Sequence, residues 1–360
     1  MQIEIYSIRG FTGSALRDSL EHALLDHHIE SDITEINSVE QFVRASIHSV
    51  PAIRVGDRIF LHSPHAKIEE TVSQVVDFLV NGSPPSILVP IDFSTESLHA
   101  LQYATMMAES LQLGMTLTHI HLPIYDPVSG GACDVLVQKE NTSQLHDLAD
   151  QIRHDFRERN INLSVDVHLE SGDPTTNLIQ LSSSEQYMLI IMATKGKDNA
   201  FRRLFSTITA KVGRNSHKPV MIIPPQSEII FPARWLIGFD QAFLEKGKLD
   251  EIHGFYRKEV TSMVYTHITN SRRPIDENLL KDFRQQITNF PDKQCEIKCE
   301  IVNPMGEPLD EVILQKAKAE HADLIVLFSQ QRSFIESLQH SSLIRRVIQQ
   351  PPLPVLIFPL

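Results

Sequence analysis

The chain has 360 residues, a formal net charge of −12 and 42% hydrophobic residues, so it is long enough for two or three globular domains. Acidic residues outnumber basic ones in each of its segments, which argues against nucleic acid and anionic membrane as partners. The three cysteines form no disulfide framework, the N-terminus has no secretory pattern, and no apolar run reaches the ~20 residues of a membrane helix. We therefore expect a cytoplasmic protein.

The first segment, residues 1–83, alternates between strand and helix patterns. Strands are expected at residues 3–7 and 33–36 and after Pro51. Helices are expected up to Leu25, at 39–46 and at 68–79.

This order resembles the thioredoxin/glutaredoxin fold, in which a cis-proline, here Pro51, precedes a strand. The redox cysteines of that family correspond to Phe11 and Ser14, and thiol–disulfide exchange needs sulfur at both positions. The resemblance therefore implies a small α/β domain without oxidoreductase activity, and Ser14 is expected to be a helix N-cap. It also implies a groove beside Pro51 for an extended peptide of an unknown protein partner.

Two breaks rich in proline and turn-forming residues divide the chain, at residues 81–85 and at 224–227. They predict three domains, which span residues 1–83, 84–225 and 226–360.

One pattern occurs twice after the first break. Each copy has a buried strand ending in aspartate, a Gly-x-Pro turn before a helix, an apolar strand, and a short closing strand after proline. Apolar strands that alternate with amphipathic segments such as residues 97–111 are typical of βαβ units in a parallel sheet covered on both faces. The matching segments are 87–92 with 235–240, 172–174 with 306–308, 188–192 with 323–327, and 219–223 with 354–358.

The first copy carries a phosphate-binding pattern. Ala193 and Gly196 follow its apolar strand, and nine residues later come Ser206 and Thr207. This spacing resembles the signature of universal stress proteins: glycine, two residues, glycine, nine residues, glycine, then serine or threonine. Glycines let the backbone approach phosphates closely, and N–H groups at a helix start point at the anion.

The resemblance covers residues 84–225 and implies a doubly wound parallel sheet of the adenine nucleotide alpha hydrolase-like type. It implies ATP, accompanied by Mg²⁺, as the cofactor. Transferred to this chain, the nucleotide-binding residues are Pro90, Asp92, Ile120, Ala193, Gly196, Ser206 and Thr207.

Two departures from the signature keep a second hypothesis open. Ala193 and Ser206 replace glycines, and the methyl group of Ala193 is tolerated only where its φ is negative. The first hypothesis is a non-catalytic stress-response regulator that binds ATP in residues 84–225. The second is a nucleotide-free scaffold or protein-interaction module. An enzyme is disfavoured because no nucleophile or acid–base pair is evident.

The second copy keeps the spacing without the glycines. Phe328 and Gln331 occupy the first two glycine positions, and Ser341 and Ser342 follow nine residues later. We expect this copy to be a structural partner. Asp240 is either a remnant of the ribose-side acid or a turn residue at the end of a strand.

The closing strands of the two copies, 219–223 and 354–358, are expected to pair and form an internal pseudo-dimer, which would protect both exposed edges. This pairing leaves a further homodimer open. No metal site is expected, because His119 and His121 share a strand face without a third ligand. Cys295 and Cys299 are expected to be ordinary core or surface residues.

Overall fold

The computed structural model describes most of the chain. Within it, no helix combines the length and the apolar character that crossing a membrane requires. The described residues form two compact units, Met1–Pro85 with Thr116–Ser171, and Ser86–Met115 with Gly172–Leu360. The structure describes residues 2–7, 11–44, 50–55, 58–61, 68–81, 85–122, 134–194, 200–268, 275–290, 292, 294–304, 306–329 and 351–360.

The first unit begins with a four-stranded sheet in the order β2-β1-β3-β4. β1 is parallel to β2 and antiparallel to β3, and β3 is antiparallel to β4. The Val50–Pro51 peptide bond just before β3 is cis, as expected. The elements are β1 (Gln2–Tyr6), α1 (Phe11–Asp26), β2 (Asp32–Ile36), α2 (Val39–Arg44), β3 (Ala52–Val55), β4 (Arg58–Leu61) and α3 (Ile68–Asn81).

Both faces of this sheet are covered because its strands alternate apolar side chains between them. Ile3 and Ile5 pack with apolar residues of α1 and α3, whereas Tyr6 packs with Phe42 of α2 on the other face. One prediction is wrong here: α1 begins at Phe11, so Ser14 lies in its first turn and is not the N-cap.

The same unit contains α5 (Asp134–Glu158) and β7 (Val165–Ser171), which pack together, and most of β6 (Gly114–His121), which neighbours β7. Residues 126–141 read as a loop in the sequence. The structure makes 134–141 the start of α5, and 126–133 lie outside the described residues.

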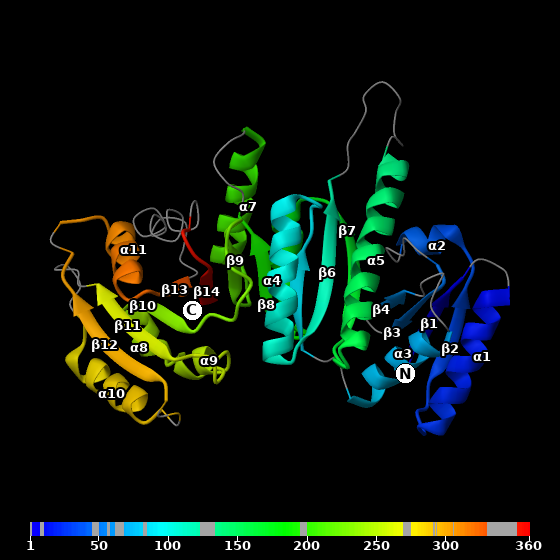
Figure 1. Cartoon of the computed structure of the whole chain (residues 1–360). Coiled ribbons are helices and arrows are strands. Elements are labelled where there is room, and N and C mark those ends of the chain that lie inside the picture. The colour runs from blue at the N-terminus through cyan, green and yellow to red at the C-terminus, as the bar shows by residue number, and fades with distance from the viewer. Residues whose placement is uncertain are drawn as a thin grey trace. The chain divides into compact units, whose positions relative to one another are not determined.

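The second unit holds eight strands in the order β12-β11-β10-β13-β14-β9-β8-β5. Its pairs are parallel apart from β14 with β9. In the second repeat, α8 and α10 contact each other and lie on the opposite face of the strands from α11 (Figure 1). The first-repeat elements are β5 (Ser86–Pro90), α4 (Thr95–Leu111), α6 (Pro174–Leu181), β8 (Tyr187–Ala193), α7 (Ala200–Asn215) and β9 (Val220–Ile223).

The second repeat has the same succession, except that two short helices follow its first strand. Its strands are almost continuously apolar and buried, as parallel strands covered on both faces must be. Its elements are β10 (Arg234–Phe239), α8 (Gln241–Lys246), α9 (Leu249–His253), β11 (Ser262–Ile268), α10 (Glu277–Thr288), β12 (Glu296–Val302), α11 (Leu309–Ala319), β13 (Leu324–Ser329) and β14 (Val355–Pro359).

The repeated Gly-x-Pro turn has a backbone reason. Gly172 has φ +131° and Gly306 has φ +92°, conformations that side chains disfavour. Each glycine leads into a helix: α6 starts at Pro174 with Asp173 as N-cap, and α11 starts just after Pro308. The two repeats therefore make the same turn before their third helix.

Two sets of contacts join the repeats. β14 pairs antiparallel with β9, which places Leu356 opposite Met221. Arg257 of the second repeat donates to the carbonyls of Ser110 (2.9 Å) and Leu111 (3.1 Å) at the C-terminal end of α4. Because the last carbonyls of a helix have no partner within it, the guanidinium caps α4.

Candidate functional site

The carboxyl ends of β5 and β8 define the candidate site in the first repeat. In an open parallel sheet, ligands bind outside the carboxyl ends of the strands, where successive connections leave in opposite directions along the sheet. In the second repeat this position in the sheet is at β10, which pairs with β11 on one side and with β13 on the other. The matching strands β5 and β8 are parallel neighbours, and Pro90 and Ala193 end them.

Asp92 lies in the turn that follows β5. The sequence predicted that it ends the strand, but β5 stops at Pro90. The half-buried Asp92 carboxylate accepts hydrogen bonds from the backbone N–H of Ser94 (3.1 Å) and from its hydroxyl. Ser94 is the N-cap of α4 and accepts from the N–H of Ser97 (3.2 Å). The turn therefore fixes the orientation of the acid at the edge of the sheet.

Ala193 has the backbone conformation that its methyl group requires, namely a φ that is not positive. It is the half-buried last residue of β8 and is not among the described residues with a positive φ. Its carbonyl accepts a hydrogen bond from the Thr209 hydroxyl of α7 (3.2 Å). Alanine thus replaces the first signature glycine without backbone strain. Gly196 lies outside the described residues.

Helix α7 starts earlier than the signature predicts. Its first residue is Ala200, so Ser206 and Thr207 lie in its interior and not at its start. The N–H groups left free in the first turn therefore belong to residues before Ser206. The physical reason is that residues 200–205 contain neither glycine nor proline, and Ser206 replaces the third signature glycine that would discourage a helix.

Ile120 is half-buried on β6, whose residues from Thr116 onward belong to the other compact unit. The structure thus brings Pro90, Asp92 and Ala193 to one edge. Among the described residues, no group of three histidine, cysteine or acidic side chains is arranged to hold a metal ion.

In the second repeat, aromatic rings fill the corresponding edge. The ring of Phe328 lies 4.4 Å from that of Phe243 and 6.0 Å from that of Phe358, measured between centroids. Asp240 caps α8 by accepting from the N–H of Phe243 (3.1 Å), which makes it a turn residue. The sequence placed Phe328 at a signature glycine position but gave no indication of its partner Phe243. Gln331, Ser341 and Ser342 lie outside the described residues.

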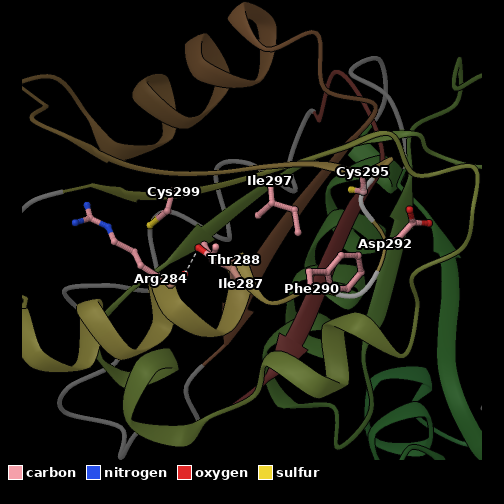
Figure 2. Close-up of a pocket in the computed structure, with 8 residues that line it drawn as sticks. All are labelled: Arg284, Ile287, Thr288, Phe290, Asp292, Cys295, Ile297 and Cys299. Atoms are coloured by element: carbon pink, nitrogen blue, oxygen red, sulfur yellow. Dashed lines mark hydrogen bonds between the residues drawn. The ribbon is translucent and has the colours of Figure 1, made fainter.

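A pocket that sequence reasoning missed lies between α10 and β12 (Figure 2). It has a volume of about 380 Å³, and both Cys295 and Cys299 line it. These cysteines are four residues apart along an extended segment, so their side chains point to the same face. This common face is the signal that could have drawn attention to the pocket.

The fold is supported by one solved structure whose TM-score exceeds 0.5, and two further structures resemble the chain more weakly. A universal stress protein from Archaeoglobus fulgidus DSM 4304 superposes with a TM-score of 0.57 at 17% identity, over 76% of this chain and 98% of that chain. A protein of Pseudomonas aeruginosa UCBPP-PA14 described as a universal stress protein gives 0.48 at 18% identity, over 77% and 94%. A universal stress protein in complex with cAMP gives 0.30 at 20% identity, over 39% and 97%. No curated protein matches the sequence.

The structure is therefore an α/β protein whose doubly wound repeats have the nucleotide alpha hydrolase-like fold. The sequence profile of the universal stress protein family matches residues 85–224 and 269–359, and the chain belongs to this family. The second match starts after β11, so it leaves out the part of the second repeat where α8 and α9 replace one long helix.

Proposed function

We propose that the protein is a non-catalytic stress-response regulator that binds ATP, together with Mg²⁺, in residues 84–225. The observation that carries this proposal is the contrast between the two strand edges. The edge of the first repeat ends in the small Ala193 beside the turn of Asp92, whereas the edge of the second is filled by Phe328 against Phe243. One nucleotide per chain is therefore the expected stoichiometry.

The proposed roles follow the family resemblance residue by residue. Pro90, Asp92 and Ile120 frame the adenosine, and Ala193 and Gly196 let the backbone approach the phosphates. Ser206 and Thr207 complete the phosphate site. Because their N–H groups lie within α7, they act either through their hydroxyl groups or after the start of α7 unwinds.

A binding role is favoured over catalysis by the state of the acid at this edge. The Asp92 carboxylate accepts hydrogen bonds from the N–H and the hydroxyl of Ser94, and these bonds hold it as part of a turn. A general base must instead reach a proton of the substrate or of an attacking water.

We further infer three domains, spanning residues 1–83, 84–225 and 226–360. The strand order β2-β1-β3-β4 and the cis bond at Pro51 support a thioredoxin-like first domain, which lacks the redox cysteines. The antiparallel pairing of β9 with β14 supports an internal pseudo-dimer of the other two.

Native mass spectrometry of the full chain with Mg-ATP tests the proposal. We expect one bound ATP per chain, lost in Gly196→Asp because a carboxylate would repel the phosphates. The matched control is Gln331→Asp, which changes the same signature position in the second repeat and should leave ATP bound. Absence of ATP from the wild-type chain at millimolar concentrations would contradict the proposal.

That negative result would support the alternative, a nucleotide-free scaffold or interaction module. The observation in its favour is the start of α7 at Ala200, which removes the N–H groups of Ser206 and Thr207 from the phosphate site. Its expected partner is a protein, for which the groove beside Pro51 is the first candidate surface.

A further inference from the structure

The pocket between α10 and β12 is separate from the edge proposed for ATP. It belongs to the second repeat and lies at the amino end of β12, around the connection from α10. Its volume of about 380 Å³ is at the lower end of the range of small-molecule sites, roughly 300–1,000 Å³. It is lined by Arg284, Ile287, Thr288, Phe290, Asp292, Cys295, Ile297 and Cys299 (Figure 2).

The floor of the pocket is apolar and firmly packed. Ile287, Phe290 and Cys295 are only 5–7% exposed. The ring of Phe290 packs against the rings of His253 and Tyr256, at centroid distances of 4.6 Å and 4.8 Å. An apolar ligand could therefore cover this floor without rearranging it.

The two ends of the pocket carry opposite charges (Figure 2). At one end Asp292 accepts from the Tyr256 hydroxyl (2.6 Å) and the Gln294 N–H (2.8 Å), and these bonds lower the pKa of its carboxyl group. At the other end the exposed Arg284 lies near the Cys299 thiol, and both line the pocket. Within the part of the chain that the structure describes, no ion pair includes Arg284.

A thiol uses little of the hydrogen-bonding capacity of a guanidinium, which has a fork of donors that suits a carboxylate. Asp292, by contrast, already accepts two hydrogen bonds. The anchoring group that the pocket offers to a ligand is therefore the cation at Arg284, next to an apolar floor.

We propose that this pocket binds a small organic carboxylate with an aliphatic or aromatic body. The carboxylate pairs with Arg284, and the body packs on Ile287, Phe290 and Ile297. The proposal does not depend on ATP binding, because no residue of the pocket belongs to the first repeat.

The test is a titration of the full chain, labelled with ¹³C at its isoleucine methyl groups, with hexanoate and phenylacetate. The neutral analogues hexanamide and phenylacetamide serve as ligand controls. We expect the carboxylates to shift the Ile287 and Ile297 signals at lower concentrations than the amides. Arg284→Gln should weaken carboxylate binding by about tenfold, since hydrogen bonds between charged groups are the strong ones.

The control variant is Lys281→Gln, which removes one positive charge from the exposed face of α10 outside the pocket. It should leave the titration unchanged. Equal affinity for amides and carboxylates, or wild-type affinity in Arg284→Gln, would reduce the pocket to an apolar cavity and overturn the proposal. Absence of shifts at Ile287 and Ile297 would overturn it as well.

Alkylation of the cysteines gives a second readout. Burial raises the pKa of the Cys295 thiol to about 11 and also raises that of Cys299, so the reaction should be run at mildly alkaline pH. Bound phenylacetate should slow alkylation of Cys299 but not that of Cys133, which belongs to the first repeat. Equal slowing of both would contradict binding in the pocket.

Discussion

Asp173 shows how a single side chain fixes the start of a helix. It is the N-cap of α6 and accepts hydrogen bonds from the N–H and the hydroxyl of Thr176, both at 2.8 Å. These bonds favour the ionised form, chiefly the one from the Thr176 N–H, and lower the pKa of Asp173 from its ordinary 3.8.

Asp173→Ala should therefore lower the free energy of unfolding by about 1 kcal/mol at pH 7. Because the folded pKa is lowered, the ionised cap stabilises fully above about pH 5, and this contribution is lost as the pH falls through the folded value. Urea unfolding at pH 7 and pH 3 should show the difference between variant and wild type shrinking in acid. Asp173→Asn keeps the cap without a titrating group, and a large loss at pH 7 in this variant would contradict the explanation.

Residue roles were only partly predictable, because short-range geometry decides them. The sequence indicated a functional acid at Asp92 and left two roles open for Asp240. The structure shows both in turns that precede a helix, Asp92 bonded to Ser94 and Asp240 to Phe243. Ser14 misled the prediction because α1 begins three residues before it. A serine marks the start of a helix as its N-cap only when the residues before it have a low helix propensity.

At the scale of elements, the strand edge of the second repeat carries a cluster of aromatic rings. The ring of Phe328 on β13 contacts two others. Its centroid lies 4.4 Å from that of Phe243 on α8 and 6.0 Å from that of Phe358 on β14. Their packing links a helix to two neighbouring strands at the point where a ligand would otherwise enter. We therefore expect these aromatic residues to contribute to stability.

Phe328→Ala should lower the free energy of unfolding by about 2 kcal/mol, less than the ~3–5 kcal/mol of a fully buried phenylalanine, because its ring is half-buried. The fluorescence of Trp235, the single tryptophan, reports unfolding of this repeat because it lies buried in β10. Ile301→Ala, at a 40% exposed position of β12, is the control and should cost less than about 0.5 kcal/mol. Equal losses in the two variants would contradict a packing role for Phe328.

The strands β5, β8 and β9 of the first repeat and β10, β13 and β14 of the second were predictable, because continuous apolar runs leave few alternatives. The start of α7 was not, since the family signature suggested one place and local helix propensity another. For the pocket between α10 and β12, the spacing of Cys295 and Cys299 indicated a shared face but not a cavity, which also depends on packing such as that of Phe290 on Tyr256. Such packing has no local sequence pattern.

At the scale of the whole molecule, Arg257 ties one repeat to the other. Besides capping α4, its guanidinium donates to the carbonyls of Gly254 (3.1 Å) and Tyr256 (2.6 Å) in its own repeat. One side chain thus bonds to backbone on both sides of the contact. The internal repeat predicted two similar sheets and the pairing of their closing strands, whereas nothing in the sequence indicated this contact.

Arg257→Ala should destabilise the paired repeats by about 2 kcal/mol, since hydrogen bonds from a charged donor are lost while carbonyls are left without a partner. We expect the urea midpoint of Trp235 fluorescence to fall and to separate from that of far-ultraviolet ellipticity. Lys258→Ala changes an exposed neighbour and should leave the two midpoints as in the wild type. A wild-type midpoint in Arg257→Ala would show that the contact does not couple the repeats.

The antiparallel pairing of β9 with β14 within one chain determines which two repeats are paired in every molecule. Two separate chains carrying these repeats would form like and unlike pairs in proportions that change on dilution. Within one chain the second strand is supplied at a high local concentration by the linker itself. Every molecule therefore contains one strand edge with Ala193 and one with Phe328, in a fixed ratio of one to one, however little protein the cell makes.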